Sequence, residues 1–204
     1  MEECRVFVID DDVSVCRGLS RLLQSAGYKT EEYNSAADFL KRELFTGTGC
    51  LVLDVRMPQK SGIELQQQLN KQNSQLPVIF LTAHGDLPIG IAAMKQGADD
   101  FLTKPVDDEI LLAAISRALA RHRATCKEQK KLSDIQRRLD RLTPREFEVL
   151  QYILGGGTNK EIANELSISE KTVKAHRGKV MNKLNASSAA EMGWICSNIV
   201  KLKS

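Results

Sequence analysis

The sequence is poor in cysteine and aromatic residues, and it has no long apolar run. Its 204 residues include five cysteines, and only 5% of them are aromatic. The cysteines are scattered and form no Cys-x-x-Cys pair, which is typical of reduced thiols rather than of a disulfide framework or a zinc site. No run approaches the ~18 apolar residues of a transmembrane helix, and no basic stretch followed by an apolar one opens the sequence. We therefore expect a cytoplasmic protein without a membrane partner.

Charge is divided unevenly along the chain. The formal net charge is +3, but residues 1–125 carry 14 basic and 17 acidic side chains, whereas residues 126–204 carry 15 and 9. The length lies between that of one large domain and that of two small ones. This asymmetry predicts two domains, the second of which faces a polyanion.

Four short apolar runs each lead into a polar residue that can take part in chemistry. They are residues 6–9 before Asp10, 50–53 before Asp54, 78–81 before Thr82, and the weaker run 100–103 before Lys104. A polar strand is expected at 28–33, and helices are expected at 13–26, 35–44, 62–72, 87–96 and 107–122. This alternation predicts an α/β fold with a doubly wound, parallel, five-stranded sheet over about the first 120 residues.

The carboxyl ends of neighbouring parallel strands would bring these polar residues into one crevice. Several carboxylates, from the run Asp10-Asp11-Asp12 and from Asp54, would repel one another there unless a cation were present, and all-oxygen ligation suits Mg²⁺. With Thr82 and Lys104 to hold phosphoryl oxygens, the set is typical of phosphoryl transfer. A lone aspartate such as Asp54 also has a plainer interpretation, as a helix cap or a salt-bridge partner.

The helix expected at 87–96 contains a glycine in its interior. Gly90 costs roughly 0.5–1 kcal/mol there relative to alanine. It indicates either close packing against a neighbour or a loose helix that moves when Thr82 changes partners.

A strongly charged stretch without glycine or proline joins the two halves between residues 121 and 142. Its apolar residues Leu132, Ile135, Leu139 and Leu142 recur at 3-4-3 spacing, as in a short coiled-coil seam. We expect a helical linker, whose seam either pairs two protomers or leads into the next domain.

The last part of the chain has the pattern of a small helical domain. Thr143 and Pro144, with Glu146 after them, are typical of a helix start. Further helices are expected at 159–166, 170–184 and 187–200, with a tight turn at 167–169. The third of the four helices carries the basic residues Lys171, Lys174, Arg177, Lys179 and Lys183. A charged helix is often only a solvated surface, but a short helix, a turn and a basic helix predict an all-α helix-turn-helix domain for a DNA major groove.

Both halves resemble a known family. Residues 1–122 are similar to the CheY-like receiver domain of two-component response regulators, and residues 142–204 to the LuxR/NarL-type helix-turn-helix domain. With the charged helix at 123–141 between them, the pair is most similar to the FixJ subfamily. The resemblance rests on the strand-end positions, on Ala83-His84-Gly85-Asp86, and on the runs Leu-Thr-Pro-Arg-Glu, Asn-Lys-Glu-Ile-Ala and Thr-Val-Lys-Ala-His.

The resemblance implies a role for each residue of the crevice. Asp54 would accept a phosphoryl group from the phosphohistidine of a sensor histidine kinase. The ligands of Mg²⁺ would be Asp10, Asp11, Asp54 and the carbonyl of Arg56. The phosphoryl-binding and switch positions would be Thr82, Lys104 and the aromatic Phe101, with a cis peptide bond before Pro105. The receiver would catalyse only its own phosphorylation and dephosphorylation, and the protein would otherwise not be an enzyme.

For the second half, the resemblance implies promoter binding and regulation of transcription. A homodimer would form on phosphorylation, and RNA polymerase would be a further partner. The expected DNA contacts are Lys160, Lys171, Thr172, Lys174, Ala175, Arg177 and Lys179. His176 is expected either to pack in the core or to contact a phosphate.

Three other interpretations agree with parts of the pattern. A phosphatase of the haloacid-dehalogenase type would use the Asp-x-Asp pattern of Asp10 and Asp12, but it would leave Asp54 without a role. Its later threonine, its lysine and its acidic pair would be Thr82, Lys104, and Asp107 with Asp108. A receiver that no longer accepts phosphate would serve only for dimerisation. A cysteine redox sensor is the third, with Cys126 as its nearest candidate.

Overall fold

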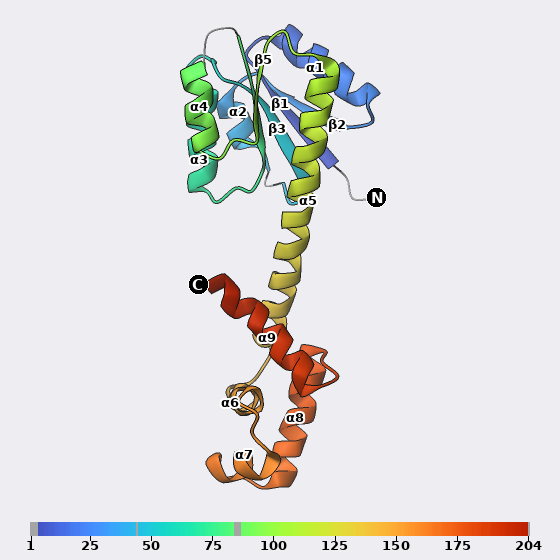
Figure 1. The fold of residues 1–204 in the computed structure, drawn as a ribbon, viewed down its shortest axis with the longest axis vertical. Helices are drawn as coiled ribbons and strands as arrows, with labels where there is room; N and C mark the ends of the chain where they lie inside the picture. Colours follow the sequence, from blue (N-terminus) through green and yellow to red (C-terminus); the bar gives the residue numbers. More distant parts are fainter. Residues whose placement is uncertain (1–3, 44, 84–86, 204) are drawn as a thin grey trace. The chain divides into compact units, whose positions relative to one another are not determined.

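The computed structural model describes residues 4–43, 45–83 and 87–203, and their side chains except those of residues 87–89 and 198–203. The chain divides into two compact units, Met1–Lys127 and Glu128–Ser204 (Figure 1). The segment expected as a linker, 123–141, is divided between them. Leu44, the expected end of a helix, and residues His84, Gly85 and Asp86 lie outside the described residues.

The first unit is built on a parallel sheet of five strands in the order β2-β1-β3-β4-β5. The strands are β1 (Cys4–Ile9), β2 (Lys29–Tyr33), β3 (Thr48–Asp54), β4 (Val78–Thr82) and β5 (Asp100–Thr103). Every residue of β3 and β4 is buried, as expected for central strands of a sheet covered on both faces. The register pairs Ile9 with Leu53 and Thr82 with Thr103, so the carboxyl ends of the strands meet at one edge.

Helices cover both faces of this sheet (Figure 1). On one face, α1 (Val13–Ser25) and the first part of α5 (Asp108–Leu139) pack around Val8 and Ile115. On the other face, α2 (Ala36–Lys41), α3 (Gly62–Lys71) and α4 (Leu87–Lys95) pack around Phe7 and Phe80. The doubly wound five-stranded fold predicted from the sequence is confirmed.

Helix α2 is shorter than predicted. It ends at Lys41, whereas the sequence indicated a helix to residue 44. Arg42 takes an extended backbone conformation, with φ −60° and ψ 157°, and its guanidinium carbon lies 3.7 Å from the ring centroid of Phe39. Because Arg42 Nη1 also donates to the carbonyl of Phe39 at 3.0 Å, the side chain folds back over the helix end and closes it early.

Helix α5 is one continuous helix of 32 residues, where the sequence indicated a helix at 107–122 followed by a helical linker. Near its carboxyl end, Ile135 and Leu139 join the hydrophobic core of the second unit, as does Leu142 after it. Three of the four residues of the expected seam are therefore used inside one protomer. This packing favours the interpretation of the seam as a lead-in to the second domain.

The second unit is helical. Its elements after α5 are α6 (Pro144–Leu154), α7 (Asn159–Glu165), α8 (Glu170–Leu184) and α9 (Ala189–Lys203). Helices α6 and α7 each begin with a capping box, in which the side chain of Thr143 or Thr158 caps the helix. The turn between α7 and α8 passes through Ser167 with a φ of 52°. The predicted helix-turn-helix is therefore formed by α7, this turn and α8.

Candidate functional site

Two carboxylates and one ammonium meet at the carboxyl edge of the sheet. Asp10 follows β1 and Asp54 ends β3, and their exposed fractions are 3% and 8%. Lys104 follows β5 and donates to Asp10 Oδ2 at 2.5 Å and to Asp54 Oδ1 at 2.6 Å. The Lys104–Pro105 peptide bond is cis, as the resemblance implied. Strands β1 and β3 are neighbours at the point where the strand order reverses, which is where open α/β sheets bind their ligands.

Backbone groups also hold the two carboxylates. Asp54 Oδ2 accepts from the N–H of Arg56 at 2.6 Å, and Asp10 Oδ1 accepts from the N–H of Asp12 at 3.0 Å. Burial raises the pKa of Asp54 against the opposing effect of Lys104, and the neighbouring Asp10 raises it further. Burial disfavours the Lys104 ammonium, but its hydrogen bonds to both carboxylates outweigh this, so the pKa of Lys104 is raised. Lys104 therefore serves as the counterion of both acids.

Thr82 and Phe101 lie on the strands beyond β3. Thr82 ends β4, is 1% exposed, and its Oγ1 donates to the carbonyl of Ala83 at 3.2 Å. The half-buried ring of Phe101 in β5 lies 6.4 Å from the ring of Phe80. A Cβ atom on Gly90 of α4 would lie 2.8 Å from the Phe101 ring. Close packing thus accounts for the glycine inside this helix, which is the first of its two interpretations.

The other aspartates after β1 have different surroundings. Asp12 caps α1, because its Oδ1 accepts from the N–H of Ser14 at 2.7 Å. Asp11 is exposed, and in the part of the chain that is described no group of three or more His, Cys, Asp or Glu side chains is placed to hold a metal ion. The structure thus brings together Asp10 and Asp54 but not Asp11. The chemistry of the pair nevertheless fits Mg²⁺, since both are hard oxygen ligands that already share a cation.

A glycine that the sequence patterns did not single out controls how closely α3 approaches this pocket. A Cβ atom on Gly62 would lie 2.2 Å from the carbonyl oxygen of Asp54 and 3.0 Å from the side chain of Leu53. Only glycine allows α3 to begin at this distance from the end of β3. The one signal in the sequence was the capping box formed by Ser61 and Glu64 around this helix start.

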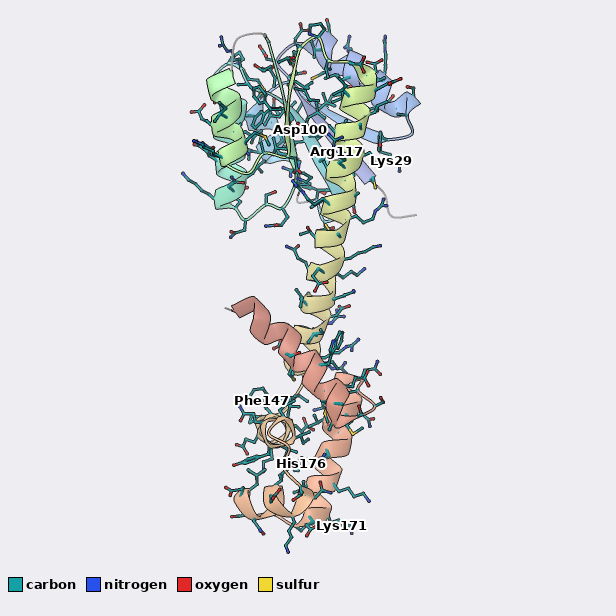
Figure 2. The ribbon with its side chains drawn as sticks, viewed as in Figure 1. Lys29, Asp100, Arg117, Phe147, Lys171 and His176 are labelled. Carbon is teal, nitrogen blue, oxygen red and sulfur yellow. The ribbon has the colours of Figure 1, made fainter. Side chains whose placement is uncertain are left out.

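Helix α8 carries a basic surface in the second unit. Five of the expected contact residues on it are exposed, as is Lys160 on α7: Lys171, Thr172, Lys174, Ala175 and Lys179. Figure 2 shows Lys171 at the amino-terminal end of α8. Arg177 is half-buried and donates to the carbonyl of Gly157 at 3.3 Å, so it also fixes the turn before α7. His176 is half-buried, and its Nδ1 is buried without a hydrogen-bond partner among the described residues, which favours packing.

Lys183 does not belong to that surface, although the sequence pattern grouped it with the basic residues of the helix. Its Nζ donates to Glu146 Oε2 at 2.6 Å, and the Glu146 side chain is only 4% exposed. The hydrogen bond from Lys183, with a second from the N–H of Thr143, lowers the pKa of Glu146 to about 2. The pair ties α8 to the first turn of α6. Helical periodicity missed it because position 183 borders the buried stripe that ends at Leu184.

The five cysteines, all of them within the described residues, form no disulfide bond. Burial raises the pKa of Cys16 to about 11 and that of Cys50 to about 12, so these thiols stay protonated at neutral pH. Cys126 Sγ lies 3.4 Å from Nε2 of His122. Within the described residues, no helix has the length and apolar character needed to cross a bilayer.

The chain matches two described families. Residues 6–116 match the response regulator receiver domain, and residues 140–193 match the bacterial regulatory proteins of the luxR family. Both are regulator classes rather than enzymes. The phosphatase interpretation gains no support, since Asp12, which it requires as a catalytic acid, is a helix cap.

Several known proteins are similar to the chain over most of its length. Response regulator protein TodT of Pseudomonas putida is 41% identical over 187 residues, which cover 92% of this chain and 82% of TodT. Transcriptional regulatory protein FixJ of Azorhizobium caulinodans is 41% identical over 191 residues, covering 94% of this chain and 90% of FixJ.

Solved structures agree with this relationship. Response regulator StyR matches with a TM-score of 0.91 at 44% identity, covering 96% of this chain and 98% of StyR. Full-length FixJ from B. japonicum matches with a TM-score of 0.59 at 37% identity, covering 98% of this chain and 99% of that one. The chain belongs to the two-component transcriptional response regulators that combine a receiver domain with a LuxR-type DNA-binding domain.

Proposed function

We propose that Asp54 accepts a phosphoryl group from the phosphohistidine of a sensor histidine kinase, and that this step controls assembly of the protein on promoter DNA. The observation that carries the proposal is the setting of Asp54. Its carboxylate ends a buried strand beside Asp10, and the Lys104 ammonium contacts both carboxylates. A buried acid held in this way has a defined orientation and a cation ready to take up new negative charge.

In the transfer step, a carboxylate oxygen of Asp54 attacks the phosphorus; before the reaction Oδ1 accepts from Lys104 and Oδ2 accepts from the N–H of Arg56, each at 2.6 Å. A P–O bond forms to Asp54 while the P–N bond to the kinase histidine breaks, and the imidazole leaves with that electron pair. Lys104 then pairs with a phosphoryl oxygen. The Thr82 hydroxyl gives up its hydrogen bond to the carbonyl of Ala83 and donates to a second phosphoryl oxygen. Mg²⁺, when bound by Asp10, Asp11, Asp54 and the carbonyl of Arg56, would neutralise phosphoryl charge. Hydrolysis of the acyl phosphate by water is the only other reaction that we assign to this site.

Dimerisation is the second part of the proposal. A phosphoryl group adds roughly −1.5 to −2 charges at the pocket, which draws Thr82 toward it. Phe101, packed against Gly90, then links the pocket to α4. Helix α4 exposes Ile91 and Met94, at 51% and 46%, which supports a contact surface on this element. We expect phosphorylation to shift a monomer–dimer equilibrium rather than to create a new fold.

DNA binding is the third part. A dimer would bring two copies of α8 to two half-sites, with each helix in a major groove. The residues assigned to DNA are Lys160, Lys171, Thr172, Lys174, Ala175, Arg177 and Lys179. The basic side chains among them provide the phosphate contacts that dominate affinity. RNA polymerase is the expected further partner, and the cytoplasm is the expected location because promoter DNA lies there.

The test combines phosphorylation with sedimentation of the full chain. Wild type, Asp54→Asn and Asp107→Asn are incubated with Mg²⁺ and acetyl phosphate, and intact mass and sedimentation coefficient are recorded. Asp107 is an exposed aspartate whose Oδ1 accepts from the N–H of Glu109 at 2.9 Å, outside the pocket, so its variant controls for the Asp-to-Asn change. We expect a one-phosphoryl mass gain and a shift toward dimer in wild type and Asp107→Asn only. A phosphoryl group retained by Asp54→Asn would contradict the assignment of the acceptor.

A further inference from the structure

The end of α5 is joined to α8, the second helix of the helix-turn-helix, within the second unit. Arg138, in the last turn of α5, donates from Nη1 to the carbonyl of Leu184 at 3.2 Å, and Leu184 is the last residue of α8. Both residues lie in the unit Glu128–Ser204, whereas the match to the luxR family begins only at residue 140. The unit that carries α8 therefore includes the last turns of α5, upstream of the matched domain.

The carbonyl that Arg138 reaches is at the end of a helix, where the helix itself supplies no donor. The last carbonyls of an α-helix have no partner within it, and the helix dipole favours a cation at that end. The N–H of Ala186 turns back to the carbonyl of Met181 at 2.9 Å, which satisfies one of these groups. Arg138 supplies a donor for another, so the end of α8 is closed from a different helix.

Apolar packing holds the same turns of α5 against the second unit. Ile135 and Leu139 belong to the same hydrophobic core as Leu184. Arg138 lies between them in the sequence and is half-buried. The hydrogen bond and the apolar packing together fix the angle between the end of α5 and α8.

Two other arginines donate to main-chain carbonyls at the ends of the helix-turn-helix. Arg145 of α6 donates from Nη2 to the carbonyl of Leu166, the C-cap of α7, at 2.5 Å. Arg177 of α8 donates to the carbonyl of Gly157, before α7, at 3.3 Å. Both of these contacts lie inside the region matched to the luxR family. Arg138 differs from them because it comes from α5, the helix that begins in the first unit.

We propose that Arg138 is a positioning residue for DNA recognition, which holds α8 at a fixed angle to α5. Because α5 is one continuous helix, a dimer formed through the first unit would carry its two copies of α8 on two such helices. A fixed junction gives the two copies of α8 one preferred separation, so the protein selects half-sites of matching spacing. The inference rests on the proposed dimerisation and DNA binding. It adds that the spacing is set at the end of α5 and not by the residues that contact DNA.

The first test needs no DNA. Hydrogen exchange of the Ala186 amide, which reports on the end of α8, is measured in the unphosphorylated full chain of wild type, Arg138→Met and Arg137→Met. Arg137 is the matched control, since its side chain is 76% exposed and pairs with Asp134 of the same helix at 2.8 Å. We expect exchange about five- to tenfold faster in Arg138→Met and unchanged in Arg137→Met. Equal exchange rates in all three proteins would overturn the inference, because Arg138 would then not hold α8.

The second test measures the dependence of DNA binding on half-site spacing. The phosphorylated wild type selects a duplex from random-sequence DNA. Affinity is then measured for that duplex, for the same duplex with two base pairs inserted between its half-sites, and for a single half-site. The insertion should weaken binding by wild type and Arg137→Met about tenfold or more, but binding by Arg138→Met less than about threefold. Both variants should bind the single half-site equally, because each has lost one positive charge.

Two results of the second test would overturn the positioning role. Equal losses on insertion for wild type and Arg138→Met would mean that this junction does not set the spacing. Weaker binding of Arg138→Met than of Arg137→Met to the single half-site and to the pair alike would mean that Arg138 only supports α8. If wild type selects no duplex with two half-sites, the proposed dimeric DNA binding fails, and the exchange test still decides whether Arg138 holds α8. If Arg138→Met does not fold, Arg138→Lys, with its shorter donor, replaces it under the same expectations.

Discussion

The ion pair between Lys183 and Glu146 gives a prediction that separates structural lysines of α8 from those on its surface. We expect Lys183→Met to destabilise the second unit, since methionine keeps most of the stem but removes the ammonium. The Glu146 carboxylate is 4% exposed and would be left with the N–H of Thr143, at 2.8 Å, as its main partner. A buried charge that loses its counterion is costly.

The magnitude follows from the exposure of the two partners. Exposed pairs contribute about 0.2–1 kcal/mol, and breaking a fully buried pair costs about 3–5 kcal/mol. Because the Lys183 side chain is still 30% exposed, the cost should lie between these limits. We expect the free energy of unfolding to fall by roughly 2–3 kcal/mol, which for a domain of this size lowers Tm by roughly 10–20 °C.

The effect should depend on pH in a defined direction. The pKa of Glu146 is lowered in the folded state, from an ordinary value of 4.5 to about 2. When folding lowers the pKa of an acid, the stabilisation that the ionised acid contributes is fully present at pH values above its ordinary pKa. That stabilisation is lost as the pH falls through the pKa of the folded state. The difference in stability between wild type and Lys183→Met should therefore be constant near neutral pH and shrink between pH 4.5 and about 2.

The assay is equilibrium unfolding of the full chain, followed by fluorescence. Trp194 is the one tryptophan in the sequence and lies in α9, so it reports on the second unit. Lys179→Met is the matched control, because Lys179 is exposed on the same helix. The control should unfold as wild type does and should bind DNA with a weaker dependence on salt. Equal unfolding midpoints for the two variants at neutral pH would refute the reasoning.

Glycine substitutions supply the remaining predictions. Gly62→Ala should destabilise the first unit by about 3 kcal/mol and slow its phosphorylation, because the new Cβ atom would lie 2.2 Å from the Asp54 carbonyl oxygen. Urea unfolding followed by circular dichroism measures the stability, and the rate of mass gain measures phosphorylation. Gly18→Ala, in α1 with nothing within 4 Å of the new Cβ atom, should instead stabilise that unit by roughly 0.5–1 kcal/mol in the same unfolding assay. Gly90→Ala should not show the stabilisation expected for Gly18→Ala, because its Cβ atom would lie 2.8 Å from the Phe101 ring. Sedimentation of this variant after phosphorylation should show less dimer than wild type. A Gly90→Ala protein as stable as Gly18→Ala would count against close packing at this site.

Much of the pocket around Asp10, Asp54 and Lys104 could be predicted from the sequence, because parallel strands carry their last residues to one edge. Asp10, Asp54 and Lys104 each follow an apolar run, so finding the runs was enough to bring the three together. The two ends of a parallel strand can also be told apart in the sequence. The crossover to the next strand begins at the carboxyl end, and the crossover from the preceding strand arrives at the amino end.

Other features depend on contacts between residues far apart in sequence, which periodicity does not reveal. Lys183 has the same chemistry as its exposed neighbours, and only the packing of α6 against α8 shows that it meets Glu146. The early end of α2 results from the stacking of Arg42 on an aromatic ring, and arginine is otherwise a good helix former. The sequence indicated a helix at 107–122 and a helical linker after it; the two form one continuous helix, whose core-facing residues belong to two different cores.

The capping boxes of α6 and α7 also bear on how fast each unit acquires its structure. Both helix starts are stabilised by side chains within three residues, so these helices can begin to form before any distant contact exists. In the first unit, by contrast, Cys4 of β1 pairs with Thr48 of β3, and these two residues are separated in the sequence by α1, β2 and α2. Chain closure over such separations is slow, whereas helical units with local contacts fold in microseconds to milliseconds. When both units refold together, the DNA-binding unit should therefore be complete first, and the receiver should limit the rate at which a responsive protein appears.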